Sequence, residues 1–217
     1  LGDVYKRQVM SGAGRTGRFL SADHWEGSDP DLVILAKGLC AGYSPLGALL
    51  APNSIVEPVV SSGGFLHGHT YASNPLSCAI ANAVLNEVVE NNLVENARVV
   101  GDYLKEGLEN LASQLSIIGD VRGRGLLLAV EVVQDKTTKS IFNVDQRAIY
   151  RISELGIKNG ILLYTRKTSK GENGEWLMIA PPLISDKDHC DDFLSKLYET
   201  LKAFEKEQGI RSVSYTH

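Results

Sequence analysis

Short apolar runs separated by glycine and proline mark the first half of the chain. Residues 32–36 (Leu-Val-Ile-Leu-Ala) form one such run, which is typical of a strand buried on both faces in a parallel sheet. The segment Gly42-Tyr-Ser-Pro45 predicts a turn, and residues 46–51 predict a second short strand. A helix is expected at 53–61, with Asn53 as its cap.

In the second half, apolar residues recur at intervals of three and four, the spacing of amphipathic helices. Pro75 suits the first turn of one helix. Ser185-Asp-Lys-Asp188 resembles a capping box, with Asp at the third helical position where Glu or Gln is usual. Shorter apolar runs between the helices predict strands. The expected helices are 76–90, 94–115, 145–156 and 185–207, and the expected strands are 126–133, 161–165 and 176–180.

The two ends of the chain look foreign to the rest, and one piece of DNA accounts for both. The codons GAT GTG TAT AAG AGA CAG encode Asp3-Val-Tyr-Lys-Arg-Gln8, and their reverse complement in another frame encodes Val213-Ser-Tyr-Thr-His217. This DNA resembles the mosaic-end adapter of transposon-based sequencing libraries. Residues 1–8 and 212–217 are therefore expected to derive from an adapter and are set aside from the fold.

Composition and charge narrow the class of protein. The chain has 22 basic and 26 acidic residues, and it contains neither a basic stripe for nucleic acid nor an apolar run long enough to span a bilayer. Cys40, Cys78 and Cys190 are odd in number and widely spaced, which favours a reducing compartment, and so the cytoplasm. His67 and His69 have no carboxylate or cysteine nearby, so no metal site is expected.

Lys37 ends the apolar run at 32–36, just before a glycine. An ammonium at the end of a buried strand loses hydration unless it is paired or chemically used. One explanation is a lysine that forms a Schiff base with a carbonyl cofactor. The other is a lysine whose stem is buried and whose amine reaches solvent. Taken alone, such a lysine favours the second explanation, but the neighbouring motifs favour the first.

Three loops surround this lysine in the sequence. Gly12-Ala-Gly-Arg-Thr-Gly17 alone is a weak signal, since it could be any tight connection. Lys37-Gly is followed by Gly42-Tyr-Ser-Pro-Leu-Gly-Ala48, and later by His67-Gly-His-Thr-Tyr-Ala-Ser-Asn-Pro75. A hydroxyl such as that of Thr70, in a loop before a helix, can bind a phosphate oxygen together with backbone N–H groups. It can equally satisfy the backbone of its own turn.

Together these loops, with Pro30-Asp31 and Gly119-Asp-Val-Arg-Gly-Arg-Gly-Leu126, resemble the class III aminotransferases. These are pyridoxal 5′-phosphate (PLP) enzymes of fold type I, and the motifs follow one another in the family's order. The resemblance implies an α/β fold. Residues 9–92 would be part of the large PLP-binding domain with its mixed or parallel sheet, and 93–211 the small C-terminal α+β domain.

The resemblance also implies roles for individual residues. Lys37 would form the Schiff base with PLP and, once freed, carry a proton between the substrate Cα and the cofactor. Val9 would pack against the pyridine ring. Thr70 would reach the phosphate of the PLP held by a neighbouring subunit, which implies a homodimer with a shared active site.

One departure from the family pattern precedes Val9. The family carries Asp-Glu there, and the Asp pairs with the pyridine nitrogen, whereas this chain carries Arg7 and Gln8. The phosphate-binding loop and the ring-stacking aromatic of the N-terminal half are missing as well. An active parent enzyme is therefore expected, of which these 217 residues are an inactive part.

Substrate recognition rests on fewer residues. Transaminases commonly hold the carboxylate of the amino acceptor with an arginine, whose planar fork pairs both oxygens. Arg166 is the candidate, although a solvated arginine beside Lys167 and Lys170 explains the sequence equally well. Trp25 and Tyr43 are candidates for lining a substrate pocket, and packing is the alternative for both.

The expected activity is transfer of an amino group from an ω-amine, ω-amino acid or amino acid donor to a 2-oxo acid. An aminomutase or a decarboxylating transaminase would use the same scaffold, and a non-catalytic binding paralogue remains an alternative. Ping-pong kinetics would separate a transaminase from these.

Overall fold

The computed structural model describes residues 5–168 and 174–210. The expected adapter-derived residues 1–4 and 212–217, and also Lys170, lie outside the described residues. The chain divides between Glu95 and Asn96 into two compact units, which are described one at a time. This division lies a few residues after the boundary expected near residue 92.

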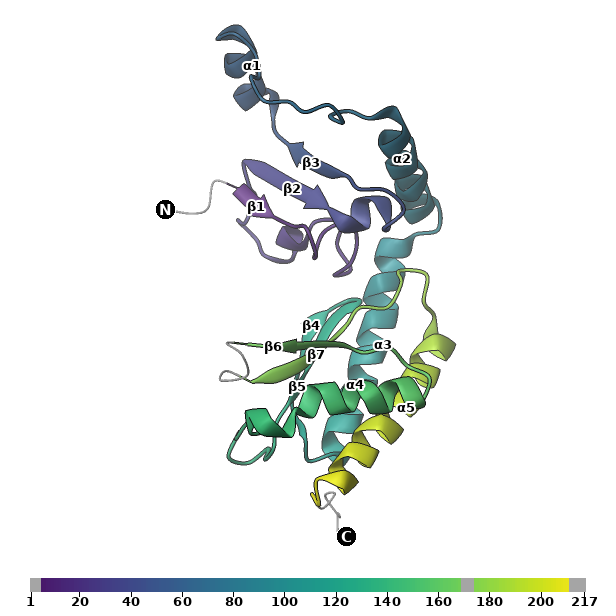
Figure 1. Ribbon diagram of the computed structural model, residues 1–217. Coiled ribbons are helices and arrows are strands. Elements are labelled where there is room, and N and C mark those ends of the chain that lie inside the picture. Colours follow the sequence, from purple (N-terminus) through teal and green to yellow (C-terminus); the bar gives the residue numbers. More distant parts are fainter. Residues whose placement is uncertain (1–4, 169–173, 211–217) are drawn as a thin grey trace. The chain divides into compact units, whose positions relative to one another are not determined.

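The first unit contains a three-stranded sheet in the order β1-β2-β3 (Figure 1). The strand β2 (Leu32–Ala36) lies in the middle, parallel to β1 (Tyr5–Arg7) and antiparallel to β3 (Gly47–Leu50). Val33 and Leu35 are buried in a small core with Leu39. The apolar run therefore forms the predicted strand, but only one of its faces is fully buried by the described residues.

Residues 5–7 form the strand β1, although residues 1–8 were expected to lie outside the fold. The backbone of residues 5–7 pairs with β2, and the Gln8 N–H continues the ladder by donating to the Ile34 carbonyl at 2.8 Å. Main-chain hydrogen bonds along a strand are available to almost any side chain, so strand pairing does not depend on where these codons came from. Their adapter origin stays a prediction.

Two helices of the first unit occur where the apolar pattern predicts them. Helix α1 (Asn53–Ser61) has the expected bounds, but its cap is Pro52, and Asn53 is the first helical residue. Helix α2 (Pro75–Glu90) begins at the expected proline and is capped by Asn74, whose Oδ1 accepts from the N–H groups of Leu76 and Ser77 at 3.0 and 3.2 Å. Two short 3-10 helices, η1 (Ser21–His24) and η2 (Lys37–Cys40), complete this unit.

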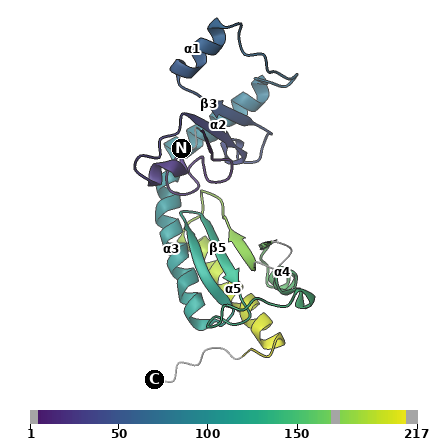
Figure 2. The ribbon, with the colours of Figure 1, turned by 90° about the vertical axis from the view of Figure 1, so that its left-hand side faces the viewer.

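The second unit packs helices against an antiparallel sheet of four strands in the order β4-β5-β7-β6. Figure 2 shows β5 in front of α5. One core joins inward-facing side chains of β5 and β7 to those of three helices. The elements are α3 (Leu93–Gln114), β4 (Ile118–Arg124), β5 (Leu127–Val132), the 3-10 helix η3 (Val144–Gln146), α4 (Ala148–Lys158), β6 (Tyr164–Lys167), β7 (Glu175–Ile179) and α5 (Lys187–Glu207).

The strand β4 was missed because Gly119-Asp120 was interpreted as a break. The chain instead stays extended through these residues and turns back at Gly125, whose φ of +54° favours glycine. A side chain on Gly101 of α3 would lie 2.2 Å from the Gly125 carbonyl carbon. These two glycines therefore allow the helix to pack closely against the hairpin turn.

Most other boundaries agree with prediction to within one residue, and three elements differ by more. The expected helix at 145–156 is split, because Arg147 adopts a left-handed conformation (φ +50°) between η3 and α4. The strand expected at 161–165 begins only at Tyr164. The final helix is capped by Asp186 rather than Ser185, and the Asp186 carboxylate accepts from the His189 N–H at 2.9 Å.

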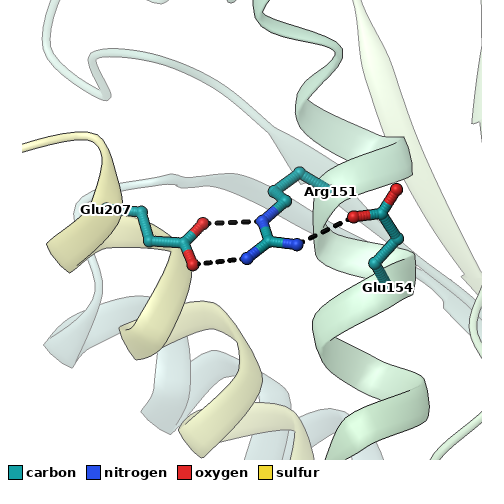
Figure 3. Close-up of polar contacts among 3 residues, drawn as sticks. All are labelled: Arg151, Glu154 and Glu207. Atoms are coloured by element: carbon teal, nitrogen blue, oxygen red, sulfur yellow. Dashed lines mark hydrogen bonds and ion pairs between the residues drawn. The ribbon is translucent and has the colours of Figure 1, made fainter.

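A bidentate ion pair joins the last two helices (Figure 3). The Arg151 guanidinium of α4 donates to both carboxylate oxygens of Glu207 on α5, at 2.6 and 2.8 Å. Its third nitrogen donates to Glu154, one turn along α4, at 2.8 Å. The hydrogen bonds from Arg151 hold the pKa of Glu207 below its ordinary value of 4.5.

Replacing Arg151 should make the stability of the second unit less dependent on pH. The pKa of Glu207 is lower in the folded state than in the unfolded state. Its ion pair therefore stabilises the fold above the unfolded-state pKa, and this stabilisation is lost as the pH falls through the folded-state pKa. We expect Arg151→Met to lower the urea midpoint at pH 7 and to match the parent chain in acid, measured by circular dichroism. The control is Arg98→Met, from an exposed pair with Asp102 at 3.4 Å. A pH-independent difference would contradict this account.

Candidate active site

Lys37 is presented at the end of β2 by an unusual backbone conformation. It is the first residue of η2, it is exposed, and its φ of +52° lies in the left-handed region. That conformation costs a residue with a side chain about 1–2 kcal/mol. Leu35 before it and Leu39 and Cys40 after it are all buried. These buried neighbours fix the chain on both sides, so the turn between them projects the lysine outward.

The turn that carries Lys37 is attached to the first turn of α2. The Ser44 and Ser77 hydroxyls lie 2.8 Å apart, and the Cys40 thiol lies 3.8 Å from the Ser77 carbonyl oxygen. Burial raises the pKa of Cys40, which keeps this thiol protonated near neutral pH. Ser44 and Ser77 were not found from the sequence, because an isolated serine gives no signal of its partner.

The glycine-rich loop at 12–17 packs beside this turn. A side chain at Gly12 would lie 2.6 Å from the Leu35 side chain and 2.7 Å from the Gln8 carbonyl oxygen, so only glycine fits. A side chain at Gly38 would lie 3.5 Å from Ala13. The structure therefore brings together two of the three loops that the sequence analysis singled out.

Two polar side chains hold the glycine-rich loop in place. Gln8 is buried, and its Oε1 accepts hydrogen bonds from the Ser21 N–H and hydroxyl. Thr16 is buried as well, and its carbonyl and hydroxyl oxygens lie 3.0 and 3.1 Å from Nε2 of His24. Val9, the expected ring-packing residue, is half-buried directly after Gln8.

Thr70 lies in the third loop and is exposed. Two turn bonds shape this loop: the Ala72 N–H donates to the His69 carbonyl at 2.9 Å, and the Tyr71 N–H donates to His69 Nδ1 at 3.2 Å. The loop leads directly to the Asn74 cap of α2. Its hydroxyl is thus placed on the surface just before a helix, and the phosphate role of Thr70 stays a prediction.

The candidate substrate residues are exposed. Trp25 makes an edge contact with the His24 ring, with centroids 5.8 Å apart, and Tyr43 follows the Lys37 turn. Arg166 belongs to the second unit, where it lies on β6 with its guanidinium 4.7 Å from the Tyr164 ring centroid. It is thus a strand residue stacked on an aromatic ring rather than a loop arginine. Their substrate roles stay predictions.

The first unit carries an apolar surface that is almost free of charge. Glu57 is the only Asp, Glu, Lys or Arg between Lys37 and Glu87, and helix α1 buries none of its residues. Exposed apolar side chains with few charges among them are typical of interaction sites when they lie together. The exposed apolar side chains here are Tyr43, Leu49, Leu50, Val56, Val59, Val60, Phe65, Leu66, Tyr71 and Leu76.

The described residues hold no cluster of three or more His, Cys, Asp or Glu side chains that could bind a metal ion. Nor does any helix among them have the length and apolar character needed to cross a membrane.

Comparison with known proteins identifies the family. The profile of the class III aminotransferases matches residues 8–201, and the chain belongs to this family. An uncharacterised aminotransferase of Bacillus subtilis, YodT, is 40% identical over 202 residues, which are 92% of this chain and 45% of that protein. The chain thus spans about half the length of the curated relatives it matches.

Solved structures give the same fold. A transaminase from a marine Virgibacillus has a TM-score of 0.88 at 31% identity, over 94% of this chain and 46% of that one. An amine transaminase of an uncultivated Pseudomonas species, solved in its PLP-bound form, has a TM-score of 0.80 at 34% identity, over 90% of this chain and 43% of that one. The expected PLP-transferase fold is therefore confirmed, with mixed α/β structure.

Replacing Lys37 with glycine should stabilise the first unit, because glycine adopts a positive φ without strain. We expect Lys37→Gly to be more stable than the parent chain by roughly 1 kcal/mol, and Lys37→Ala to be about as stable as the parent. Hydrogen exchange of the β2 amides would measure this. Ala41→Gly is the matched control, since Ala41 has a φ of +48° and no expected role in chemistry. Equal exchange in Lys37→Gly and Lys37→Ala would show that the turn is unstrained.

Proposed function

We propose that the chain is the C-terminal part of a PLP-dependent transaminase. The enzyme moves an amino group from an ω-amine, ω-amino acid or amino acid donor to a 2-oxo acid. The observation that carries this proposal is Lys37, exposed in a left-handed turn at the end of β2 and held there by buried neighbours. Strained conformations at exposed polar residues concentrate at functional sites. Family membership supplies the cofactor.

The residues present fit PLP at two points and fail at a third. Lys37 offers an exposed amine, and Thr70 offers an exposed hydroxyl before a helix. Position 7, at the end of β1, is where the family carries its aspartate, and here it is Arg7. A guanidinium cannot pair with a protonated pyridine nitrogen, because both are positive. The activity is therefore assigned to a full-length enzyme with a carboxylate at this place, and none is expected of this chain.

Position 7 suits that carboxylate on geometric grounds. β1 and β2 are parallel, with residue 7 opposite Ile34, so β1 ends at the same edge of the sheet at which β2 delivers Lys37. Ligands of parallel sheets bind at this edge. The backbone thus supports an acid and an amine at neighbouring strand ends.

Lys37 performs the proton transfer in the proposed reaction. PLP, when bound, supplies an electron sink for the electron pair left at the substrate Cα. The Lys37 amine would hold the cofactor and, once released, its Nζ would move a proton from the substrate Cα to the cofactor. An amine accepts a proton only in its neutral form, so Lys37 would act as a base through its free amine. Arg166 would hold the carboxylate of the 2-oxo acid.

We propose a homodimer as the working form. The exposed apolar residues in and around α1 support this. The centres of protein–protein interfaces are depleted in charged residues, and this segment carries almost none. Thr70 lies on the same exposed segment and would reach the phosphate of the partner's cofactor. The free thiols of Cys40, Cys78 and Cys190 agree with a cytoplasmic protein.

Lys37→Ala in the full-length enzyme should reduce kcat/KM by on the order of a thousandfold or more, because the group that moves the proton is lost. The parent enzyme should show ping-pong kinetics, releasing the oxo product of the donor before the acceptor reacts. Lys105→Ala removes a half-buried α3 lysine that pairs with Glu109. This variant should leave kcat/KM and the ping-pong kinetics unchanged. Full activity in Lys37→Ala would refute the assignment. A parent that returns the amino group to the same molecule would be an aminomutase.

A further inference from the structure

A buried ion pair lies next to the candidate substrate arginine in the sequence. Lys167 Nζ lies 2.9 Å from a Glu175 carboxylate oxygen, and their side chains are only 16% and 6% exposed. Among the ion pairs within the described ranges, this is the one in which both partners are largely buried. Burying two charges is costly, so such a pair is weak evidence for stability and is better explained by structural specificity.

The pair joins three elements. Lys167 is the last residue of β6, and Glu175 is the first residue of β7, directly opposite. The second carboxylate oxygen of Glu175 accepts from the Ile149 N–H in the first turn of α4 at 3.2 Å. Lys167 Nζ also lies 4.8 Å from the Tyr150 ring centroid. The end of β6 is therefore fixed to the neighbouring strand and to a helix at the same time.

The residue after Lys167 also contributes to the register at this end of β6. The Thr168 N–H donates to the Gly174 carbonyl at 3.0 Å, and the Thr168 hydroxyl accepts from Nε1 of Trp176 at 3.2 Å. β6 is an edge strand of four residues that pairs with β7 alone, and its residues are exposed or half-buried, with none fully buried. Leu163 packs against the core just before the strand begins, which fixes its start. Side chains alternate between faces along a strand, so a slip of one residue would turn Arg166 to the opposite face of the sheet.

We propose that Lys167 is a positioning residue for Arg166. Its ion pair with Glu175 holds the end of β6 in register, so that Arg166 stays opposite Trp176 and stacked on the Tyr164 ring, 4.7 Å away. An arginine held flat against a ring loses less freedom when it binds a carboxylate. This inference rests on the proposed function, in which Arg166 binds the 2-oxo acid.

The register is tested first in the 217-residue chain by nuclear magnetic resonance. The double variant Lys167→Met/Glu175→Gln removes both charges and leaves an amide oxygen to accept from Ile149, so we expect it to fold. We expect it to weaken the cross-strand contact between Arg166 and Trp176, because only the Thr168 hydrogen bonds then hold this strand end, whereas Lys167→Arg keeps the contact. Lys206→Met, at an exposed α5 lysine, is the control for charge removal. A double variant that retains the contact undiminished would overturn the proposal.

The effect on recognition is then tested in the full-length enzyme. We expect the double variant to raise KM for a 2-oxo acid about tenfold, because a charge-assisted hydrogen-bond pair is misplaced. KM for an amine donor without a carboxylate should not change, and Lys167→Arg should restore the parent value. Equal rises for both substrates would overturn the positioning role.

A separate variant, Arg166→Gln, distinguishes the role of Arg166 in binding the carboxylate from the role of Lys167 in setting the strand register. If it leaves KM for the 2-oxo acid unchanged, Arg166 does not bind the carboxylate, and that part of the proposed function is wrong. The register result for Lys167 would stand in that case, because it is measured without substrate.

Discussion

The candidate site depends on one constraint, the left-handed turn at Lys37. β2 buries Leu35, and the chain buries Leu39 and Cys40 immediately afterwards. Because Leu35 and Leu39 are both buried, the chain between them turns instead of continuing the strand. In this turn Lys37 adopts the left-handed conformation, and its side chain is exposed. The proposed chemistry depends on this placement of the Lys37 amine at the edge of the sheet, which the packing of the neighbouring residues causes.

The loops around Lys37 serve this constraint. The glycine-rich loop reaches β2 only because Gly12 leaves room for Leu35. The hydrogen bonds of Gln8 with Ser21 and of Thr16 with His24 hold the loop. The serine pair between the Lys37 turn and α2 sets the turn relative to the segment that carries Thr70. In the second unit the same principle recurs. A buried pair, Lys167 with Glu175, fixes the strand end next to an exposed arginine.

The sequence predicts those elements whose cause is local. The apolar run at 32–36, the proline at the start of α2 and the amphipathic spacing of α3 each require only neighbouring residues, and the structure confirms them. Lys37 was singled out as a candidate because motifs that resemble the family surround it, and its role stays a prediction. β4 was missed because its glycines resemble a break, and only its pairing with β5 keeps it extended.

Other features could not be predicted because their partners are distant in the sequence. Ser77 meets Ser44, and Glu175 caps a helix that begins at Ala148, through contacts that only the fold creates. Gln8 was set aside together with its neighbours, although its side chain organises the glycine-rich loop. The strand pairing of residues 5–7 is a backbone property, which no side-chain pattern could indicate.

Sequencing the source gene across the codons before Val9, amplified without a transposon step, would show whether the parent enzyme carries an acid beside Lys37. Because position 7 ends β1 beside the strand that delivers Lys37, we expect the gene to carry codons for Asp-Glu at positions 7 and 8. Native codons for Arg7 and Gln8 would contradict this expectation. They would remove the partner of the pyridine nitrogen and favour a binding protein built on a transaminase scaffold.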